Sequence, residues 1–309
     1  MRVFVTGSTG FVGAAVVKEL LAHGHSVLGL TRKGADQLKS QGAEVLEGSI
    51  EDMTLLKKAA SECDAVAHLA FVHDFTRYAE CCAIDRAAIE ALANGLLEGK
   101  GDAKDKALVI TSGTMMLPQH QLVDEATPYD TTGGLGALRG QSEAVCLDFA
   151  KQGLRTAVVR LPPSTHGPGV SGFAGILAIA ALQKGSSAYI GEGQNKWCAG
   201  HRDDAAKIYR LAIERGEPGR IYHAVAEESL TLKDVATEIG KQLDLPVISI
   251  KPEDADAQFG AWKFTAEADN FATSNKTREQ LGWTPTELGL IEDMTNVVAF
   301  VKNIPPGTF

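Results

Sequence analysis

Three glycines that follow an apolar segment carry the clearest chemical signal in this sequence. Gly7, Gly10 and Gly13 stand at G-x-x-G-x-x-G spacing, between the apolar run Arg2–Thr6 and a segment whose apolar residues recur at helical intervals. Glycine allows a tight turn and, because it has no Cβ, lets the backbone approach a bound pyrophosphate. The start of the next helix offers free N–H groups and a positive dipole end. The spacing predicts a dinucleotide-phosphate loop; a glycine turn without a ligand is the alternative.

The residues after the second expected strand indicate which nicotinamide dinucleotide would bind. NAD sites of this type carry an acidic residue there, which accepts a hydrogen bond from the ribose 2′-hydroxyl. This sequence has Thr31, Arg32 and Lys33 instead. No carboxylate in this triplet repels a 2′-phosphate, and the two cations can bind it. We therefore expect NADP(H) rather than NAD, with a solvated basic turn as the alternative interpretation.

Three side chains are candidates for the proton transfer that accompanies hydride transfer. The imidazole of His73 follows the fourth expected strand, and its ordinary pKa near 6.5 suits proton donation at neutral pH. His166 precedes a Gly-Pro turn and could reach the mouth of the pocket. The hydroxyl of Thr114 could bond a substrate carbonyl. The structural alternatives are a loop histidine bonded only to backbone, a packed hinge histidine and a hydroxyl that caps local backbone.

Other polar residues give weaker indications. Tyr129 lies in a loop that could swing inward, Asp74 could orient His73, and His201 is expected to begin a helix. The sequence has no His, Cys and acidic cluster with the spacing of a metal site. It also has no G-x-S-x-G nucleophile motif.

Alternating strand and helix signals must position these residues. The first half predicts a doubly wound parallel sheet of Rossmann type, covered by helices on both faces. Helical segments are expected around 12–21, 53–60, 81–97 and 135–151. The carboxyl ends of the strands then share one edge, where ligands bind. The expected strands are Arg2–Thr6, Ser26–Leu30, Ala43–Leu46, Ala65–Leu69, Ala107–Thr111 and Thr156–Leu161.

The alternation breaks after Leu161, where two prolines and a Gly-Pro-Gly turn follow. We expect an NADP-binding domain over residues 1–165. A smaller substrate lobe is expected over 166–309, interleaved with segments around 201–225 that complete the sheet. In this half the sequence predicts a helix over Ala205–Glu214, strands at Ile221–Val225 and Val247–Ile250, and a capping box at Thr231–Asp234.

Composition excludes several classes of protein. The 309 residues carry a formal net charge of −9, which argues against a nucleic-acid partner. No apolar run approaches the roughly 20 residues that span a bilayer, so no membrane association is expected. The five cysteines are odd in number and lack C-x-x-C spacing. With an opening that reads as a strand rather than a signal peptide, they favour a reduced, cytoplasmic location.

Taken together, these motifs resemble the extended branch of the short-chain dehydrogenase/reductase superfamily, the NAD-dependent epimerase/dehydratase family. The resemblance covers nearly the whole chain, although Ser49 stands where the family usually has aspartate and Asp85 where it often has asparagine. It rests on Gly48-Ser49-Ile50, Ala65-Val66-Ala67-His68-Leu69-Ala70, the stretch Arg160 to Gly169, His201-Arg202-Asp203-Asp204-Ala205-Ala206 and the stretch Ser274 to Pro285. With the motifs above, it implies that the cofactor contacts Gly7, Thr9, Gly10, Phe11, Val12, Gly13, Arg32, Lys33, Ser49, Ile50, Leu69, Ala70, Phe71, His73, Arg139, Pro162, Pro163 and Ser164.

The sequence departs from the family at its Tyr-x-x-x-Lys proton-donor motif. Aligning on Glu143 places Leu135 in the tyrosine slot and Arg139 in the lysine slot. Leucine has no proton to give, and a guanidinium can bond ribose hydroxyls but is a poor general acid. The serine that polarises the substrate oxygen aligns with Gly113, and Thr114 is the nearest hydroxyl. The sequence thus resembles atypical subgroups that keep the dinucleotide site and lack the usual dyad.

The sequence predicts an NADP(H)-dependent oxidoreductase that acts on a small organic carbonyl or alcohol with a non-standard proton donor. His73, Thr114, Arg139 and His166 are the candidate catalytic residues. The alternatives are a catalytically inactive NADP(H)-binding redox sensor, or an epimerase or dehydratase of the sugar-nucleotide type. The resemblance also implies a homodimer that pairs through the helices near 81–97 and 135–151.

Overall fold

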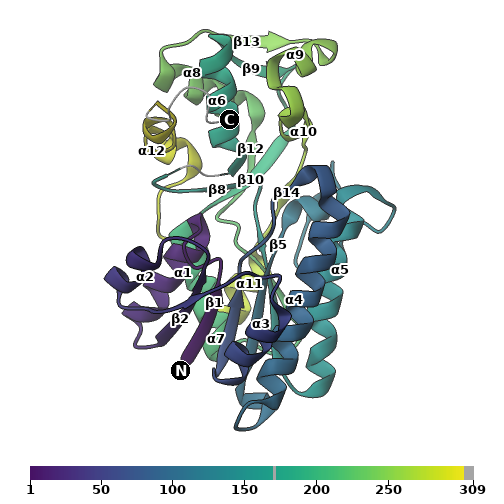
Figure 1. Ribbon diagram of the computed structural model, residues 1–309. Helices are drawn as coiled ribbons and strands as arrows, with labels where there is room; N and C mark the ends of the chain where they lie inside the picture. The colour runs from purple at the N-terminus through teal and green to yellow at the C-terminus, as the bar shows by residue number, and fades with distance from the viewer. Residues whose placement is uncertain (170–171, 303–309) are drawn as a thin grey trace.

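A computed structural model describes residues 1–169 and 172–302 of the chain. A lower lobe holds the N-terminal strands and an upper lobe lies across one end of them (Figure 1). The sheet of the lower lobe has seven strands in the order β11-β7-β5-β4-β1-β2-β3, and every pairing is parallel. The expected doubly wound parallel sheet is confirmed. Its strands are β1 (Arg2–Thr6), β2 (Ser26–Thr31), β3 (Glu44–Glu47), β4 (Ala65–His68), β5 (Ala107–Gly113), β7 (Arg155–Leu161) and β11 (Arg220–His223).

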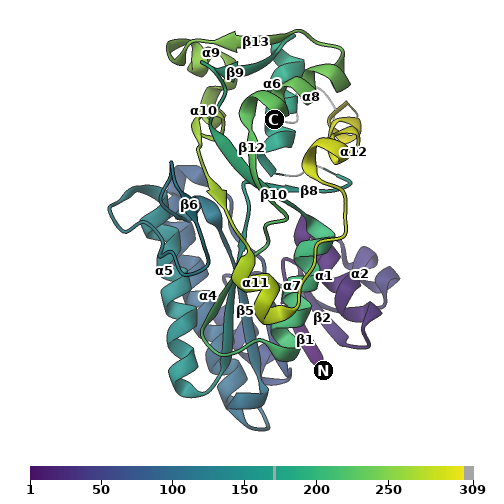
Figure 2. The same cartoon turned by 180° about the vertical axis from the view of Figure 1, so that it is seen from behind.

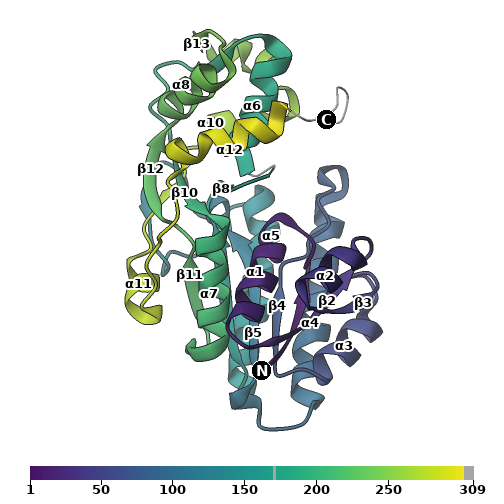
Figure 3. The same ribbon diagram turned by 90° about the vertical axis from the view of Figure 1, so that its left-hand side faces the viewer.

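Helices cover both faces of this sheet, and Figure 3 shows α7 running beside α1. Successive strand residues point to opposite faces, so Val3 and Val5 pack on the side of α1 and α7 while Phe4 packs on the other. Both faces are buried, which is why the strands read as nearly continuous apolar runs. The flanking helices are α1 (Phe11–Ala22), α2 (Ala35–Gln41) and α7 (Arg202–Arg215), and opposite them α3 (Met53–Ser61), α4 (Tyr78–Glu98) and α5 (Gly134–Asp148).

The upper lobe has its own apolar core, centred on the fully buried Trp197. The chain does not stay within it: Figure 2 shows the chain descending to α11 and rising again to α12. The segment Arg202–His223 likewise returns to the lower lobe as α7 and β11. The remaining helices of the chain are α6 (Gly172–Lys184), α8 (Leu232–Leu243), α9 (Ala255–Phe259), α10 (Lys263–Glu267), α11 (Asn275–Leu281) and α12 (Leu290–Lys302), and of these α11 contacts α7 and β11 of the lower lobe. The remaining strands are β6 (Leu122–Val123), β8 (Ser164–His166), β9 (Ser187–Ile190), β10 (Lys196–His201), β12 (Glu227–Thr231), β13 (Val247–Ile250) and β14 (Phe271–Ala272).

Two local sequence signals have the expected geometry. The hydroxyl of Thr231 accepts from the backbone N–H of Asp234 at 3.1 Å and donates to its carboxylate at 2.6 Å, which caps α8 as predicted. His201 caps α7 by accepting from the backbone N–H of Asp203 at 3.1 Å.

The five cysteines are free thiols, all buried. Among the described residues no helix is both long and apolar enough to cross a membrane.

A buried ion pair ties α5 to the sheet. Arg160 on β7 donates to Glu143 through Nε at 2.9 Å and Nη2 at 2.6 Å, and both side chains are at most 2% exposed. The guanidinium also donates to the carbonyl of Thr127 at 2.8 Å. Water cannot replace a lost partner at such a depth.

We therefore predict that Glu143→Ala lowers the free energy of unfolding by about 3–5 kcal/mol, because it leaves a buried guanidinium without its carboxylate. The control is Glu98→Ala, which breaks the exposed Lys57–Glu98 pair and is expected to cost at most about 1 kcal/mol. Urea unfolding followed by circular dichroism measures both. Equal losses in the two variants would contradict a structural role for the Arg160–Glu143 pair.

Candidate functional site

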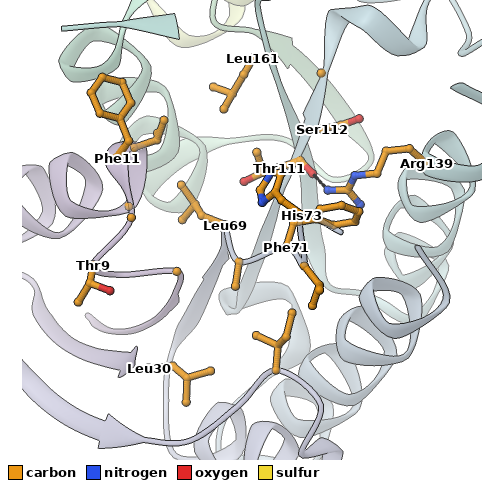
Figure 4. Close-up of a pocket in the computed structure, with 18 of the residues that line it drawn as sticks. Thr9, Phe11, Leu30, Leu69, Phe71, His73, Thr111, Ser112, Arg139 and Leu161 are labelled. Carbon is orange, nitrogen blue, oxygen red and sulfur yellow. Dashed lines mark hydrogen bonds between the residues drawn. The ribbon is translucent and has the colours of Figure 1, made fainter. Parts of the chain in front are cut away.

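A cleft of about 690 Å³ opens at the carboxyl edge of the sheet, beneath the upper lobe (Figure 4). Its lining comes from the segments that follow β1, β2, β3 and β4, from the ends of β5 and β7, and from helices of both lobes. Ligands bind at this edge in doubly wound sheets because the loops there are free to diverge. Of the residues that the sequence assigned to the cofactor, the lining includes Gly7, Thr9, Gly10, Phe11, Val12, Gly13, Arg32, Ser49, Ile50, Leu69, Ala70, Phe71, His73 and Arg139.

The glycine loop is packed so tightly that side chains cannot enter it. Gly7 has φ +67°, and a Cβ there would lie 2.8 Å from the backbone nitrogen of Ala70. A Cβ on Gly13 would lie 2.0 Å from the carbonyl oxygen of Gly7. Gly10 is the N-cap of α1 and has no side chain to bond the first-turn N–H groups. The loop therefore fits the pyrophosphate of a dinucleotide, which those N–H groups and the helix dipole would hold.

The end of the cleft beyond β2 has a basic and an acidic side chain. Arg32 lines it, whereas Lys33 is exposed and does not. The turn is fixed by Thr31, whose buried hydroxyl accepts from the backbone N–H of Lys33 at 3.1 Å. Ser49 lines the same end, and its hydroxyl accepts from the backbone N–H of Glu51 at 3.2 Å. Glu51 is an acidic lining residue that the sequence analysis did not single out.

A buried chain of polar groups lies beneath the middle of the cleft. The Nδ1 of His68 contacts the Thr6 hydroxyl at 2.7 Å, and its Nε2 contacts Asp85 at 3.3 Å. The other oxygen of Asp85 accepts from Arg139, which also donates to the carbonyl of Thr111 at 2.7 Å. Burial opposes the charge on Asp85, but the guanidinium of Arg139 and the hydrogen bond from His68 hold its pKa below the ordinary value.

The ionised carboxylate fixes the protons along this chain. A neutral His68 that donates from Nε2 to Asp85 would accept the proton of the Thr6 hydroxyl at Nδ1. The oxygen of Thr6 is then free to accept from the backbone N–H of Ala70 at 3.2 Å. Ala70 is also the residue against which Gly7 packs. The polar chain and the glycine loop thus meet at one backbone segment.

The side chains of Arg139 and His73 both pack against the ring of Phe71. The Cζ of Arg139 stands 4.6 Å from the centre of the Phe71 ring, and the His73 ring lies edge-on to it at 5.2 Å. Figure 4 shows the three side chains together in the cleft. Desolvation by the surrounding groups and then the charge of Arg139 lower the pKa of the His73 imidazole. His73 lines the cleft, whereas the other two candidate proton donors, Thr114 and His166, do not.

Thr114, expected as the nearest hydroxyl to the substrate, lies elsewhere. Its side chain is fully buried and donates to the amide oxygen of Asn270 at 2.7 Å, outside the cleft lining. The reason is that β5 continues through Gly113, and the 3-10 turn that begins at Thr114 directs it toward the upper lobe. Thr111 and Ser112 line the cleft instead. The Ser112 oxygen is buried and has no partner among the described residues.

His166 also lies outside the cleft lining. Its ring is fully buried, and Nδ1 bonds Asp293 of α12 at 2.8 Å. β8 pairs with β10 so that His166 stands beside His201, whose ring lies edge-on at 5.4 Å. This pairing encloses His166 in the upper lobe, beneath α12. Three other expected cofactor contacts, Pro162, Pro163 and Ser164, are buried on the same stretch and do not line the cleft.

The remaining sequence candidates have local partners. Asp74 accepts from the backbone N–H of Thr76 and from Nε of Arg77, both at 3.0 Å, and does not orient His73. The ring of Tyr129 lies against the backbone of Gly140 in α5. Among the described residues, His201, Asp203 and Glu287 come close enough together to hold a metal ion. Because Nδ1 of His201 already accepts the helix-cap bond, we assign this group to the start of α7.

Sequence reasoning missed the apolar far end of the cleft. Met115 and Met116 lie in the 3-10 turn Thr114–Met116 that follows β5, so the rule that ligands bind at strand ends could have found them. Phe173 and Phe264 come from α6 and α10 of the upper lobe. No periodicity or motif in the sequence brings these two rings to the sheet edge.

Comparison with known proteins gives one family and a range of activities. The profile of the NAD dependent epimerase/dehydratase family matches residues 3–224. The chain is 41% identical over 298 residues to a Saccharomyces cerevisiae protein described as uncharacterized, covering 95% of this chain and 98% of that protein.

A second relative is the 4-hydroxy-2-methyl-3-oxo-4-farnesyl-3,4-dihydroquinoline-1-oxide ketoreductase of Stigmatella aurantiaca. It is 27% identical over 273 residues, covering 86% of this chain and 79% of the ketoreductase. Among solved structures, the Thermus thermophilus UDP-glucose 4-epimerase in complex with NAD superposes with a TM-score of 0.75. It covers 98% of this chain and 99% of the epimerase at 19% sequence identity, and so shows the shared fold.

The packing of the glycine loop yields a test of nucleotide binding. Gly13→Ala places a Cβ against the Gly7 carbonyl, so α1 must move away from the loop. We predict at least about a tenfold loss of NADPH affinity by calorimetry. The control is Gly24→Ala, since Gly24 has φ +77° but nothing within 4 Å of the added atom. Unchanged binding by Gly13→Ala would remove the loop as the phosphate seat.

Proposed function

The chain belongs to the NAD-dependent epimerase/dehydratase family, and on this premise we propose that it is an NADP(H)-dependent oxidoreductase acting on a small organic carbonyl or alcohol. The observation that carries the proposal is one continuous cleft with a phosphate-binding glycine loop in its wall and a titratable imidazole, His73, further along it. The ketoreductase relative supports carbonyl chemistry, since a ketoreductase reduces a carbonyl group.

The NADP(H) preference rests on the turn after β2. Arg32 lines the cleft there, and the triplet Thr31 to Lys33 has no carboxylate to accept a ribose 2′-hydroxyl. A 2′-phosphate would meet the guanidinium in a charge-assisted hydrogen bond. Glu51 is exposed at the same end and can turn to solvent.

In the proposed reaction, the glycine loop and Arg32 would hold the dinucleotide, which would supply a hydride when bound. His73, in its imidazolium form, gives a proton to the carbonyl oxygen as that oxygen gains negative charge. Arg139 moves no proton, because its guanidinium stays charged and is bonded to Asp85 and Thr111. Instead, Arg139 packs against Phe71 and offers its remaining N–H groups to the ribose.

A second function, an NADP(H) sensor without turnover, is favoured by one observation. The arginine in the lysine slot is bound into a buried ion pair with Asp85, and Leu135 in the tyrosine slot has no phenol proton whose transfer its charge could assist. The cofactor cleft would be intact in such a protein. The two functions differ only in turnover.

Several expectations from the sequence stay predictions. These are the homodimer through α4 and α5, the cytoplasmic location, and the division of the chain at residue 165 into a cofactor domain and a substrate lobe.

We predict that the wild-type protein binds NADPH more tightly than NADH. Arg32→Ala is expected to weaken NADPH binding about tenfold and to leave NADH binding within about twofold, because only NADPH carries the phosphate that the guanidinium contacts. Lys39→Ala, an exposed cation on the neighbouring α2, is the control and should change neither. Calorimetric titrations measure all six dissociation constants. Tighter NADH binding by the wild type would refute the preference.

We further predict a pH dependence of carbonyl reduction. Because the pKa of His73 is lowered, little imidazolium is present at pH 7, so kcat/KM should rise as the pH falls through a midpoint below the ordinary value of about 6.5. His73→Gln should reduce kcat about 100-fold and remove this dependence. His23→Gln, a surface histidine 44% exposed, should keep both. A His73→Gln profile like that of the wild type would exclude His73; tight NADPH binding without turnover at any pH would favour the sensor.

A further inference from the structure

The far end of the cleft is an apolar chamber, which we define by Met115, Met116, Leu161, Phe173 and Phe264. All five are partly accessible or exposed, and Phe264 is 36% exposed. Apolar side chains that line a cleft without being buried gain free energy when a ligand removes them from water. The chamber is therefore suited to an apolar occupant.

The aromatic wall of this chamber is supported from behind. Phe173 meets Phe264 edge-on at 5.7 Å, and the buried Trp197 meets Phe173 edge-on at 5.9 Å. Trp262 lies 5.9 Å from Phe264 on the other side. Because each ring is held by a neighbour, Phe173 and Phe264 present a preformed surface and lose little rotamer freedom when a ligand binds.

The residues that define the chamber carry no charge, whereas the diphosphate of a nucleotide sugar needs cations around it. Among the described lining residues, the ionisable side chains other than Tyr78 are Arg32 and Glu51 near β2 and β3, and His73 and Arg139 near the middle. Arg139 already donates to Asp85 and to the Thr111 carbonyl. A diphosphate in the chamber would give up water without gaining a free cation, which is unfavourable.

Another guanidinium, that of Arg202, lies at the phosphate loop. Arg202 stands 4.6 Å over the ring of Phe11 and pairs with Asp203 at 3.6 Å. It is not part of the cleft lining. It therefore does not supply the chamber with the charge that a diphosphate requires.

We propose that the chamber binds an uncharged, largely apolar carbonyl compound, with its carbonyl oxygen toward His73 and its apolar body between the two methionines and the two phenylalanines. The inference rests on the proposed function, whose substrate class it names. It makes Phe173 and Phe264 the residues that determine specificity. It also excludes nucleotide sugars, although the structurally similar epimerase is named for UDP-glucose.

The test uses full-length protein loaded with NADPH and three probes: acetophenone, the charged oxo acid pyruvate, and UDP-glucose. Quenching of bound NADPH fluorescence reports probe binding, and loss of NADPH absorbance reports turnover. We expect acetophenone to bind at least about tenfold more tightly than either charged probe. Phe264→Ala should weaken acetophenone binding about tenfold, change kcat less than about threefold and leave NADPH affinity unchanged.

Phe300→Ala is the matched control, because this ring is 43% exposed on α12 and lies outside the cleft lining. Binding of acetophenone without turnover would support the chamber and refute the oxidoreductase function. Turnover of pyruvate in preference to acetophenone would support the function and overturn the chamber. UDP-glucose has no free carbonyl group to reduce and reports binding alone, and tighter binding of UDP-glucose than of acetophenone would also overturn the chamber. Failure of acetophenone to bind, or equal losses in Phe264→Ala and Phe300→Ala, would also overturn the chamber.

Discussion

The ion pair between Asp85 and Arg139 is the interaction on which the cleft depends. It joins α4 to α5 across the face of the sheet, and through His68 and the Thr111 carbonyl it also engages β4 and β5. Since both groups are nearly inaccessible to water, each is stable only while the other is present. The pair therefore fixes the spacing of the elements whose ends form the cleft wall.

The same pair explains why proton transfer must lie elsewhere in the cleft. A guanidinium keeps its proton, and its contacts with Asp85 and Thr111 direct it to the sheet rather than to a substrate. Its positive charge nevertheless acts at a distance. It lies over the Phe71 ring and adds to desolvation in lowering the pKa of His73, whose ring packs edge-on against Phe71. The arginine thus disfavours the charged form of the imidazole, which makes His73 a readier proton donor once it is protonated.

The sequence predicted the lower lobe well because its signals are local. Strands buried on both faces read as apolar runs, and the glycine loop needs only neighbours within one turn. The predictions that were wrong concern residues whose positions depend on distant contacts or on the exact residue at which a strand ends. Thr114 was misplaced because β5 extends two residues further than its apolar run. His166 was misplaced because its partner, Asp293, is 127 residues away. Helix α6 was missed because its sequence is apolar on nearly all sides and shows no periodic face.

The cofactor end of the cleft is fixed by local segments, whereas the chamber is fixed by distant contacts within the upper lobe. The sheet edge supplies the phosphate loop and Arg32 from short segments, each fixed by its own strand, so the cofactor end depends little on the upper lobe. The chamber instead takes Phe173 and Phe264 from helices whose placement depends on the core around Trp197. Changes in that core would re-aim the two rings without disturbing the glycine loop. A family built this way can keep one cofactor site while its substrates differ, because the two sites are fixed by separate sets of contacts.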